Sequence, residues 1–124
     1  MKLEIELSWP AKELSPNARV HWAVKAKKTA AYRQEAMIAT RNKMDYGKIP
    51  SERLHLFITY FQPDKRSRDE DNLLSSLKPA MDGIAYALGV NDKLFRSHPF
   101  VSDEIVKGGM VQIVITEDPE ESAK

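Results

Sequence analysis

Hydrophobic and charged residues alternate at the start of the chain, where Leu3, Ile5 and Leu7 occupy every second position. A period of two residues is typical of a β-strand with one buried face. A second strand-like segment spans 53–62, and its β-branched and aromatic residues occupy both faces. We expect this second strand to be central in a sheet and to be covered on both sides.

Two other segments favour helices. Residues 27–44 are rich in Ala, Lys, Arg, Gln, Glu and Met and contain no Gly or Pro. Between 73 and 88, apolar residues recur at helical spacing, and Gly89 then marks the end of the helix. Pro79 predicts a kink in this helix, or a short first turn followed by a fresh start. Residues 11–24 show no period and predict a long loop.

Two final strands are expected at 100–107 and 110–116, joined at Gly108-Gly109 by a two-residue hairpin turn. The order β-α-β-α-β-β then predicts a single small α+β domain, with a mixed sheet of about four strands and two helices. We assign residues 1–117 to this domain and 118–124 to a flexible acidic tail.

Composition excludes several classes of function. The 124 residues include no cysteine, so disulfides, thiolate metal sites and cysteine nucleophiles are ruled out. The three histidines lack the spacing of a zinc site, and the chain has neither a G-x-S-x-G elbow nor a phosphate-binding P-loop. No apolar run reaches membrane-spanning length and no signal peptide is evident, so we expect a cytoplasmic protein without membrane contact.

The formal net charge of +1 hides an uneven distribution. Residues 117–124 hold four acidic residues and one lysine, which leaves 18 basic against 14 acidic residues in the rest of the chain. The basic residues cluster in two short segments, at Arg19, Lys25, Lys27 and Lys28 and again at Lys65, Arg66 and Arg68. Such clusters are often solvated surface, but beside acidic chemistry they predict a polyanionic partner such as nucleic acid.

The acidic chemistry follows the second basic segment directly. Asp69 and Asp71 precede the second helix, and alternate positions in extended or turn backbone can direct both carboxylates toward one point. Carboxylates without nearby thiolate or imidazole suit Mg²⁺ or Mn²⁺. Asp92, in the loop after the same helix, offers a third carboxylate if the fold returns it. The alternative is that Asp69 and Asp71 only cap the helix.

Four motifs occur in order along the chain: R-D-E-D-N-L-L at 68–74, K-P-A-M-D-G-I at 78–84, V-N-D at 90–92 and K-G-G-M-V-Q-I-V-I-T-E at 107–117. With Trp9-Pro10 after the first strand, and Asn17 and Arg19 in the following loop, they resemble the RusA family of Holliday junction resolvases. The similarity covers nearly the whole chain.

The resemblance implies that Asp69, Asp71 and Asp92 are the metal-binding catalytic carboxylates, that Lys78 is a catalytic-site lysine and that Arg68 contacts DNA. The chain departs from the family pattern at two places. Asn91 stands where an aspartate is frequent, and some members place the lysine one helical turn after the second aspartate, where this chain has Ser75. We expect the other basic residues of the two clusters to bind the DNA backbone: Arg19, Lys25, Lys27, Lys28, Lys65 and Arg66.

The implied function is that of a Mg²⁺-dependent endodeoxyribonuclease, with Mn²⁺ as a possible substitute, which resolves four-way DNA junctions as a homodimer and needs no small-molecule cofactor. Trp9, Trp22, Phe95 and Phe100 are candidate dimer anchors, with core packing as the alternative for each. Two other functions stay open: a metal-dependent nuclease for other branched or flapped DNA, and a non-catalytic nucleic-acid-binding module whose acidic residues only cap a helix.

Overall fold

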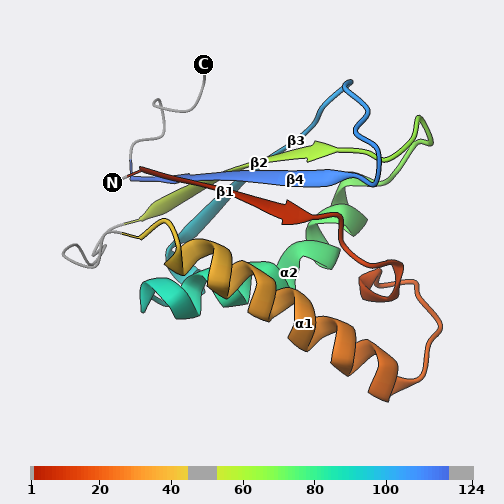
Figure 1. Cartoon of the computed structure of the whole chain (residues 1–124), viewed down its shortest axis with the longest axis horizontal. Helices are drawn as coiled ribbons and strands as arrows, with labels where there is room; N and C mark the ends of the chain where they lie inside the picture. Colours follow the sequence, from red (N-terminus) through yellow and green to blue (C-terminus); the bar gives the residue numbers. More distant parts are fainter. Residues whose placement is uncertain (1, 45–52, 118–124) are drawn as a thin grey trace.

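The computed structural model describes residues 2–44 and 53–117. In these residues a four-stranded sheet carries both long helices on one face (Figure 1). The strands are β1 (Lys2–Ser8), β2 (Leu54–Phe61), β3 (Phe95–Val101) and β4 (Met110–Thr116), the helices are α1 (Trp22–Arg41) and α2 (Glu70–Leu88), and two short 3-10 helices are η1 (Lys12–Leu14) and η2 (Asp92–Leu94). The expected α+β domain is confirmed, and its strands and helices follow in the predicted order. The tail 118–124 lies outside the described residues.

The strands lie in the order β1-β4-β2-β3, with β2 and β3 parallel and β4 antiparallel to both β1 and β2. The expected hairpin at Gly108-Gly109 is therefore wrong, because β3 and β4 are not neighbours. The 102–109 connection continues along the end of β2, where the Ser102 N–H donates to the Tyr60 carbonyl and the Val106 N–H donates to the Gln62 carbonyl. The third strand consequently ends at Val101 and begins earlier than predicted.

Strand β2 is central, as expected, but only one of its faces is fully covered. Leu54, Leu56, Ile58 and Tyr60 point toward the helices and are at most 1% exposed. The alternate positions are only half-buried, because neither described helix packs on that side of the sheet (Figure 1). The prediction of cover on both sides is wrong for residues 2–44 and 53–117, which leave this face of the sheet open.

Helix α1 begins at Trp22, inside the segment expected to be a loop. The side chain of His21 caps it, since its Nδ1 accepts a hydrogen bond from the Ala23 N–H at 3.1 Å. Only a narrow stripe of the helix is buried, formed by Tyr32, Ala36 and Thr40 at intervals of four residues. This stripe packs against α2 and the sheet.

Helix α2 connects the parallel strands β2 and β3 and runs without interruption through Pro79, so the expected fresh start is wrong. Asp69 caps its beginning, because one carboxylate oxygen accepts from the backbone N–H groups of Asp71 and Asn72. Gly89 ends it in the left-handed conformation, with φ of 70°, as the sequence predicted.

The two helices approach each other closely at Gly83. A Cβ atom added there would lie 2.2 Å from the Arg33 carbonyl oxygen and 3.2 Å from the Met37 nitrogen. Both atoms belong to the backbone of α1, which cannot yield as a flexible side chain does. Glycine at this position therefore sets the distance between α1 and α2.

We predict that Gly83→Ala destabilises the protein, although alanine is the better helix former by about 1 kcal/mol. Separating two packed helices costs about 1–3 kcal/mol in comparable overpacked cores, which exceeds that gain. Urea unfolding monitored by circular dichroism measures the difference. The control is Ser75→Ala on the exposed side of α2, expected to change stability by less than about 0.5 kcal/mol. A Gly83→Ala variant as stable as the control would contradict the close packing.

Candidate active site

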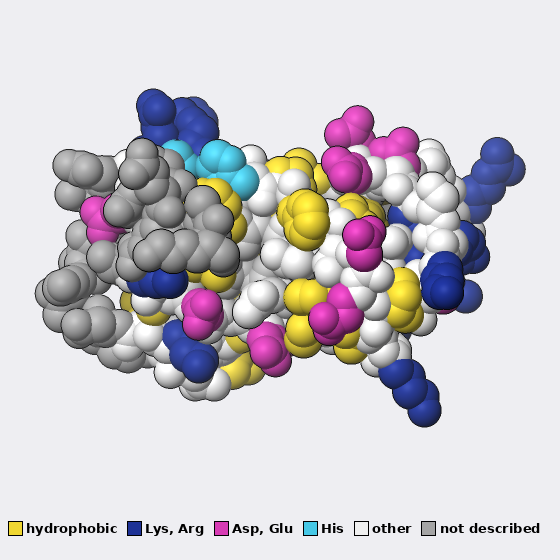
Figure 2. Space-filling view, turned by 90° about the horizontal axis from the view of Figure 1, so that it is seen from above, with side chains coloured by type: hydrophobic (Ala, Val, Ile, Leu, Met, Phe, Trp, Pro, Cys, Tyr) yellow, Lys and Arg dark blue, Asp and Glu magenta, His cyan; other side chains and the backbone are white. Residues whose placement is uncertain are grey.

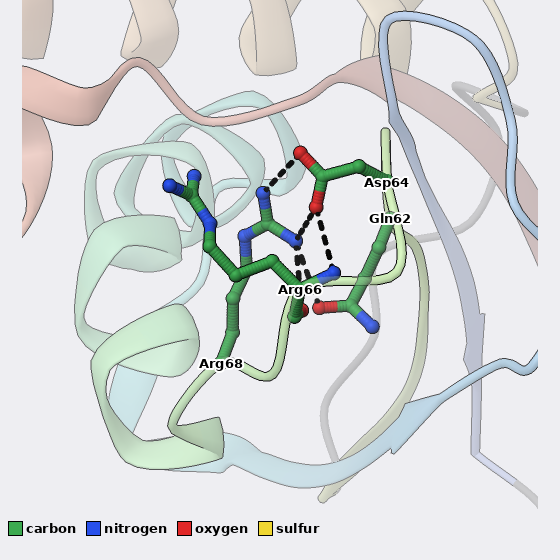
Figure 3. A network of polar contacts seen from close by, with 4 residues as sticks. All are labelled: Gln62, Asp64, Arg66 and Arg68. Carbon is green, nitrogen blue, oxygen red and sulfur yellow. Dashed lines mark hydrogen bonds and ion pairs between the residues drawn. The ribbon is translucent and has the colours of Figure 1, made fainter.

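The loop between β2 and α2 is held by one arginine. Arg68 Nη1 donates to Gln62 Oε1 at 3.2 Å, to Asp64 Oδ1 at 3.0 Å and to the Arg66 carbonyl at 3.2 Å, and its Nη2 donates to Asp64 Oδ2 at 3.3 Å (Figure 3). We call these four residues the Arg68 network. The arginine side chain is only 14% exposed. Arg68, expected to contact DNA, thus has its donors directed into its own loop.

Asp64 also accepts a hydrogen bond from the backbone N–H of Arg66, at 2.9 Å. The hydrogen bond from the Arg68 side chain and this backbone bond lower the pKa of the Asp64 carboxyl. The carboxylate is therefore present well into the acidic range, and the network weakens only as pH falls below the ordinary range of aspartate. The side chain of Arg66 extends away from the network and is exposed (Figure 3).

Trp9 supports the arginine from the other side. The Arg68 guanidinium carbon lies 5.5 Å from the centre of the Trp9 ring, and the Trp9 and Tyr60 rings form a T-shaped pair with centroids 6.2 Å apart. A Cβ at Gly109 would lie 2.8 Å from the Trp9 side chain, and Gly109 has φ of 75°. The tryptophan after β1 and the second glycine of K-G-G therefore fit together and position Arg68.

Asp69 and Asp71 follow Arg68 at the start of α2. Asp69 uses a carboxylate oxygen to cap the helix, and Asp71 is exposed in the first turn. Both carboxylates benefit from the positive end of the helix dipole. The capping role proposed as the alternative is thus observed for Asp69.

Two other motif residues meet about two turns further along the same helix. Lys78 Nζ lies 3.5 Å from Asp92 Oδ2, and 3.8 Å from Asp82 Oδ1 one turn further along α2. The three side chains are 43–67% exposed, so these ion pairs add little stability. The contact shows that the loop after α2 returns Asp92 to the middle of the helix, beside Lys78.

The three aspartates do not meet within one chain. Among residues 2–44 and 53–117, no three Asp, Glu, His or Cys side chains lie close enough together to hold a metal ion. Asp69 and Asp71 lie at the start of α2, whereas Asp92 contacts Lys78, whose backbone lies roughly 10 Å further along the helix axis than that of Asp71. The expected convergence of the three carboxylates into one cluster is therefore not seen among the described residues. Their assignment as metal ligands stays a prediction.

The two basic segments come to the same end of the molecule. Arg66 lines a groove of about 510 Å³ together with Lys12, Trp9 and Ala11, and Asp69 lies in the same groove. Lys28 lines a smaller adjoining pocket that shares Trp9 and Ala11. The other predicted DNA-binding residues, Arg19, Lys25, Lys27 and Lys65, are exposed or half-buried. Lys12 is a basic residue that sequence reasoning missed, since it stands alone in its segment.

Comparison with known proteins finds a relative of this chain. No family model matches the chain. An uncharacterized protein of Xylella fastidiosa (strain Temecula1 / ATCC 700964) is 44% identical over 114 residues, which is 90% of this chain and 74% of that protein. The chain belongs to the same family as that protein. The relative's description states no activity. Within the described ranges, neither α1 nor α2 has the length and apolarity needed to span a membrane.

We predict that Arg68→Lys loosens the 62–69 loop although the positive charge is kept. A lysine ammonium cannot reproduce the planar fork that Arg68 presents to Gln62 and Asp64. Amide hydrogen exchange measured by mass spectrometry should be at least about tenfold faster in peptides that cover this loop. Arg66→Lys, which leaves the network intact, should exchange like wild type. Equal protection in both variants would show that the loop does not depend on Arg68.

Proposed function

We propose that this protein is a Mg²⁺-dependent, structure-selective endodeoxyribonuclease of the cytoplasm, which resolves four-way DNA junctions as a homodimer in DNA recombination and repair. The observation that carries the proposal is the contact between Lys78 and Asp92 at 3.5 Å. These residues belong to two separate motifs of the RusA-like pattern and are predicted to act together in catalysis. Their contact supports position 78, and not position 75, as the place of the catalytic-site lysine in this chain.

The surface around the candidate site supports the same proposal. Lys12, Lys28 and Arg66 lie around the segment that contains Trp9 and Ala11, next to Asp69. Cations in this arrangement bind a phosphate backbone without reading its sequence. A lysine such as Lys78 stabilises negative charge that develops on a phosphate or on its leaving oxygen.

One observation favours a second candidate function, a non-catalytic DNA-binding module. Asp69 caps α2, and the described residues contain no cluster that could hold a metal ion. A binding module predicts junction affinity that does not depend on Mg²⁺ and no nicking with any metal. A nuclease for other branched DNA would use the same catalytic residues, but it would cleave forks or flaps more strongly than four-way junctions.

We predict that Asp69→Asn, Asp71→Asn and Asp92→Asn each reduce Mg²⁺-dependent nicking of a synthetic four-way junction by at least about 100-fold. Junction binding should be unchanged or tighter, because each variant removes negative charge near the DNA. Asparagine caps helices as well as aspartate, so Asp69→Asn keeps the start of α2. Nicking is measured on a gel with Mg²⁺, Mn²⁺, Ca²⁺ or EDTA, and binding by mobility shift.

The matched control is Asp103→Asn, which removes an exposed carboxylate from the 102–109 connection and should cleave like wild type. Linear duplex, fork and flap substrates complete the comparison. Near wild-type nicking by Asp71→Asn would refute the assigned carboxylates. No nicking by the wild-type protein with any metal, together with tight junction binding, would favour the binding module.

A further inference from the structure

The groove of about 510 Å³ opens at the end of the molecule where β1 and β2 end (Figure 1). The segment after β1, the 62–69 loop and the first two turns of α2 line it. Figure 2, which views the open face of the sheet, shows several Lys and Arg side chains projecting from this end of the molecule (right-hand side). The volume lies within the range of about 300–1,000 Å³ in which proteins bind one small ligand. The groove therefore has room for one nucleotide, whereas a base pair cannot enter because each of its bases continues into a backbone.

The charges in the groove favour an anionic ligand. Its charged lining residues are the cations Lys12, Arg66 and Arg68 and the acids Asp64 and Asp69. Arg68 neutralises Asp64 through their bidentate contact, and the start of α2 compensates Asp69, which caps it. Within residues 2–44 and 53–117, the side chains of Lys12 and Arg66 make no ion pair or hydrogen bond. These two cations are therefore available to the phosphates of a ligand.

Charged residues next to the groove do not reverse this balance. Glu13 follows Lys12 in the sequence and Glu70 opens α2, but neither lines the groove. Lys65 precedes Arg66, and Lys28 lines the adjoining pocket, so two cations accompany these two acids. The surroundings are close to neutral, and they leave the charge of Lys12 and Arg66 uncompensated.

The remaining lining of the groove suits a nucleic-acid base. Trp9 and Pro63 contribute apolar surface, against which the flat face of a base packs. Asn72 lines the same groove and is half-buried, and its backbone N–H and carbonyl are bonded to the side chains of Asp69 and Ser76. Its side-chain amide makes no hydrogen bond with any described residue. An amide presents a donor and an acceptor side by side, which matches the edge of a base.

A base reaches such a groove only after it has left the stack, and this costs least where the base is unpaired or its stacking is interrupted. A branch point offers such nucleotides, whereas a continuous duplex does not. We propose that the groove binds one unstacked nucleotide of branched DNA, with its base against Asn72 and its flanking phosphates on Lys12 and Arg66.

The inference rests on the proposed function and deepens it, since it makes the groove the source of the preference for branched over continuous DNA. Asp69, one of the three candidate catalytic carboxylates, lines the same groove. A nucleotide bound there therefore brings a phosphate of the branch point close to this carboxylate.

The test is binding of the full chain to short fluorescent duplexes in EDTA, measured by anisotropy. One duplex is continuous, a second has a single-nucleotide bulge, and a third has an abasic residue at the bulge. The bulged duplex should bind at least about 30-fold more tightly than the continuous one, because its extra base is already unpaired. The abasic bulge should lose this preference, since the backbone is bent but no base enters the groove.

Asn72→Ala should reduce the preference for the bulge about tenfold and leave binding of the continuous duplex unchanged. Alanine is a good helix former, so this variant keeps the start of α2. Lys12→Ala should instead weaken all three duplexes alike and lower the log–log salt slope by about 0.9. The matched control is Asn42→Ala, at the end of α1 and outside the groove, which should bind like wild type.

Equal binding of bulged and continuous duplexes by the wild-type protein, or an unchanged bulge preference in Asn72→Ala, would overturn the inference. So would displacement of the bulged duplex by micromolar free deoxynucleoside monophosphate, since the groove would then belong to free nucleotides. Circular dichroism confirms that each variant is folded. Nicking of four-way junctions is scored separately: nicking without a bulge preference refutes the nucleotide groove alone, whereas a bulge preference without nicking refutes the nuclease alone.

Discussion

The bidentate contact between Arg68 and Asp64 is the interaction on which the candidate site depends. It closes the loop that leads from β2 to α2, and a further bond to Gln62 ties the loop to the end of the strand. Because the Gln62 carbonyl also accepts from Val106, the same residue connects this loop to the 102–109 connection. The position at which α2 begins, and with it the position of Asp69, follows from these bonds.

Trp9 connects this loop to the segment of Gly109, which is distant in the sequence. Its ring contacts both the Arg68 guanidinium and the Tyr60 ring, and Gly109 leaves the space that the Trp9 ring occupies. A larger residue at position 109 would displace the ring, and the arginine above it would lose its support. Three segments far apart in sequence thus determine the geometry of one loop, while Lys78 and Asp92 meet further along α2.

The sequence predicted what local chemistry determines. Asp69 as a cap, Gly89 as a stop and the central position of β2 follow from propensity and pattern, and all three are confirmed. Strand β3 was misplaced because it is an edge strand with Pro99 in its middle, and such a strand lacks a clear alternation. The start of α1 was missed because Trp22 and Val24 are exposed and give no helical period.

The parts of the site that sequence could not supply arise from long-range pairing. Asp64 and Gln62 carry no motif, and only the folded loop shows that they hold Arg68. Likewise no spacing in the sequence relates His55 to His98, and only the parallel pairing of β2 with β3 places them side by side. The convergence of three carboxylates is an expectation from alternate positions and from resemblance, and neither tells where along α2 the following loop returns Asp92, which contacts Lys78.

The central proposal is that this protein makes two paired cuts in a four-way junction. It is tested most directly on a supercoiled plasmid with an extruded cruciform. With Mg²⁺ the wild-type protein should convert the plasmid to linear DNA within one binding event, because two coordinated cuts release two intact duplex ends. With EDTA the plasmid should stay supercoiled while the protein remains bound. A plasmid that stays supercoiled with both Mg²⁺ and Mn²⁺, under conditions where the junction is saturated, would contradict the account.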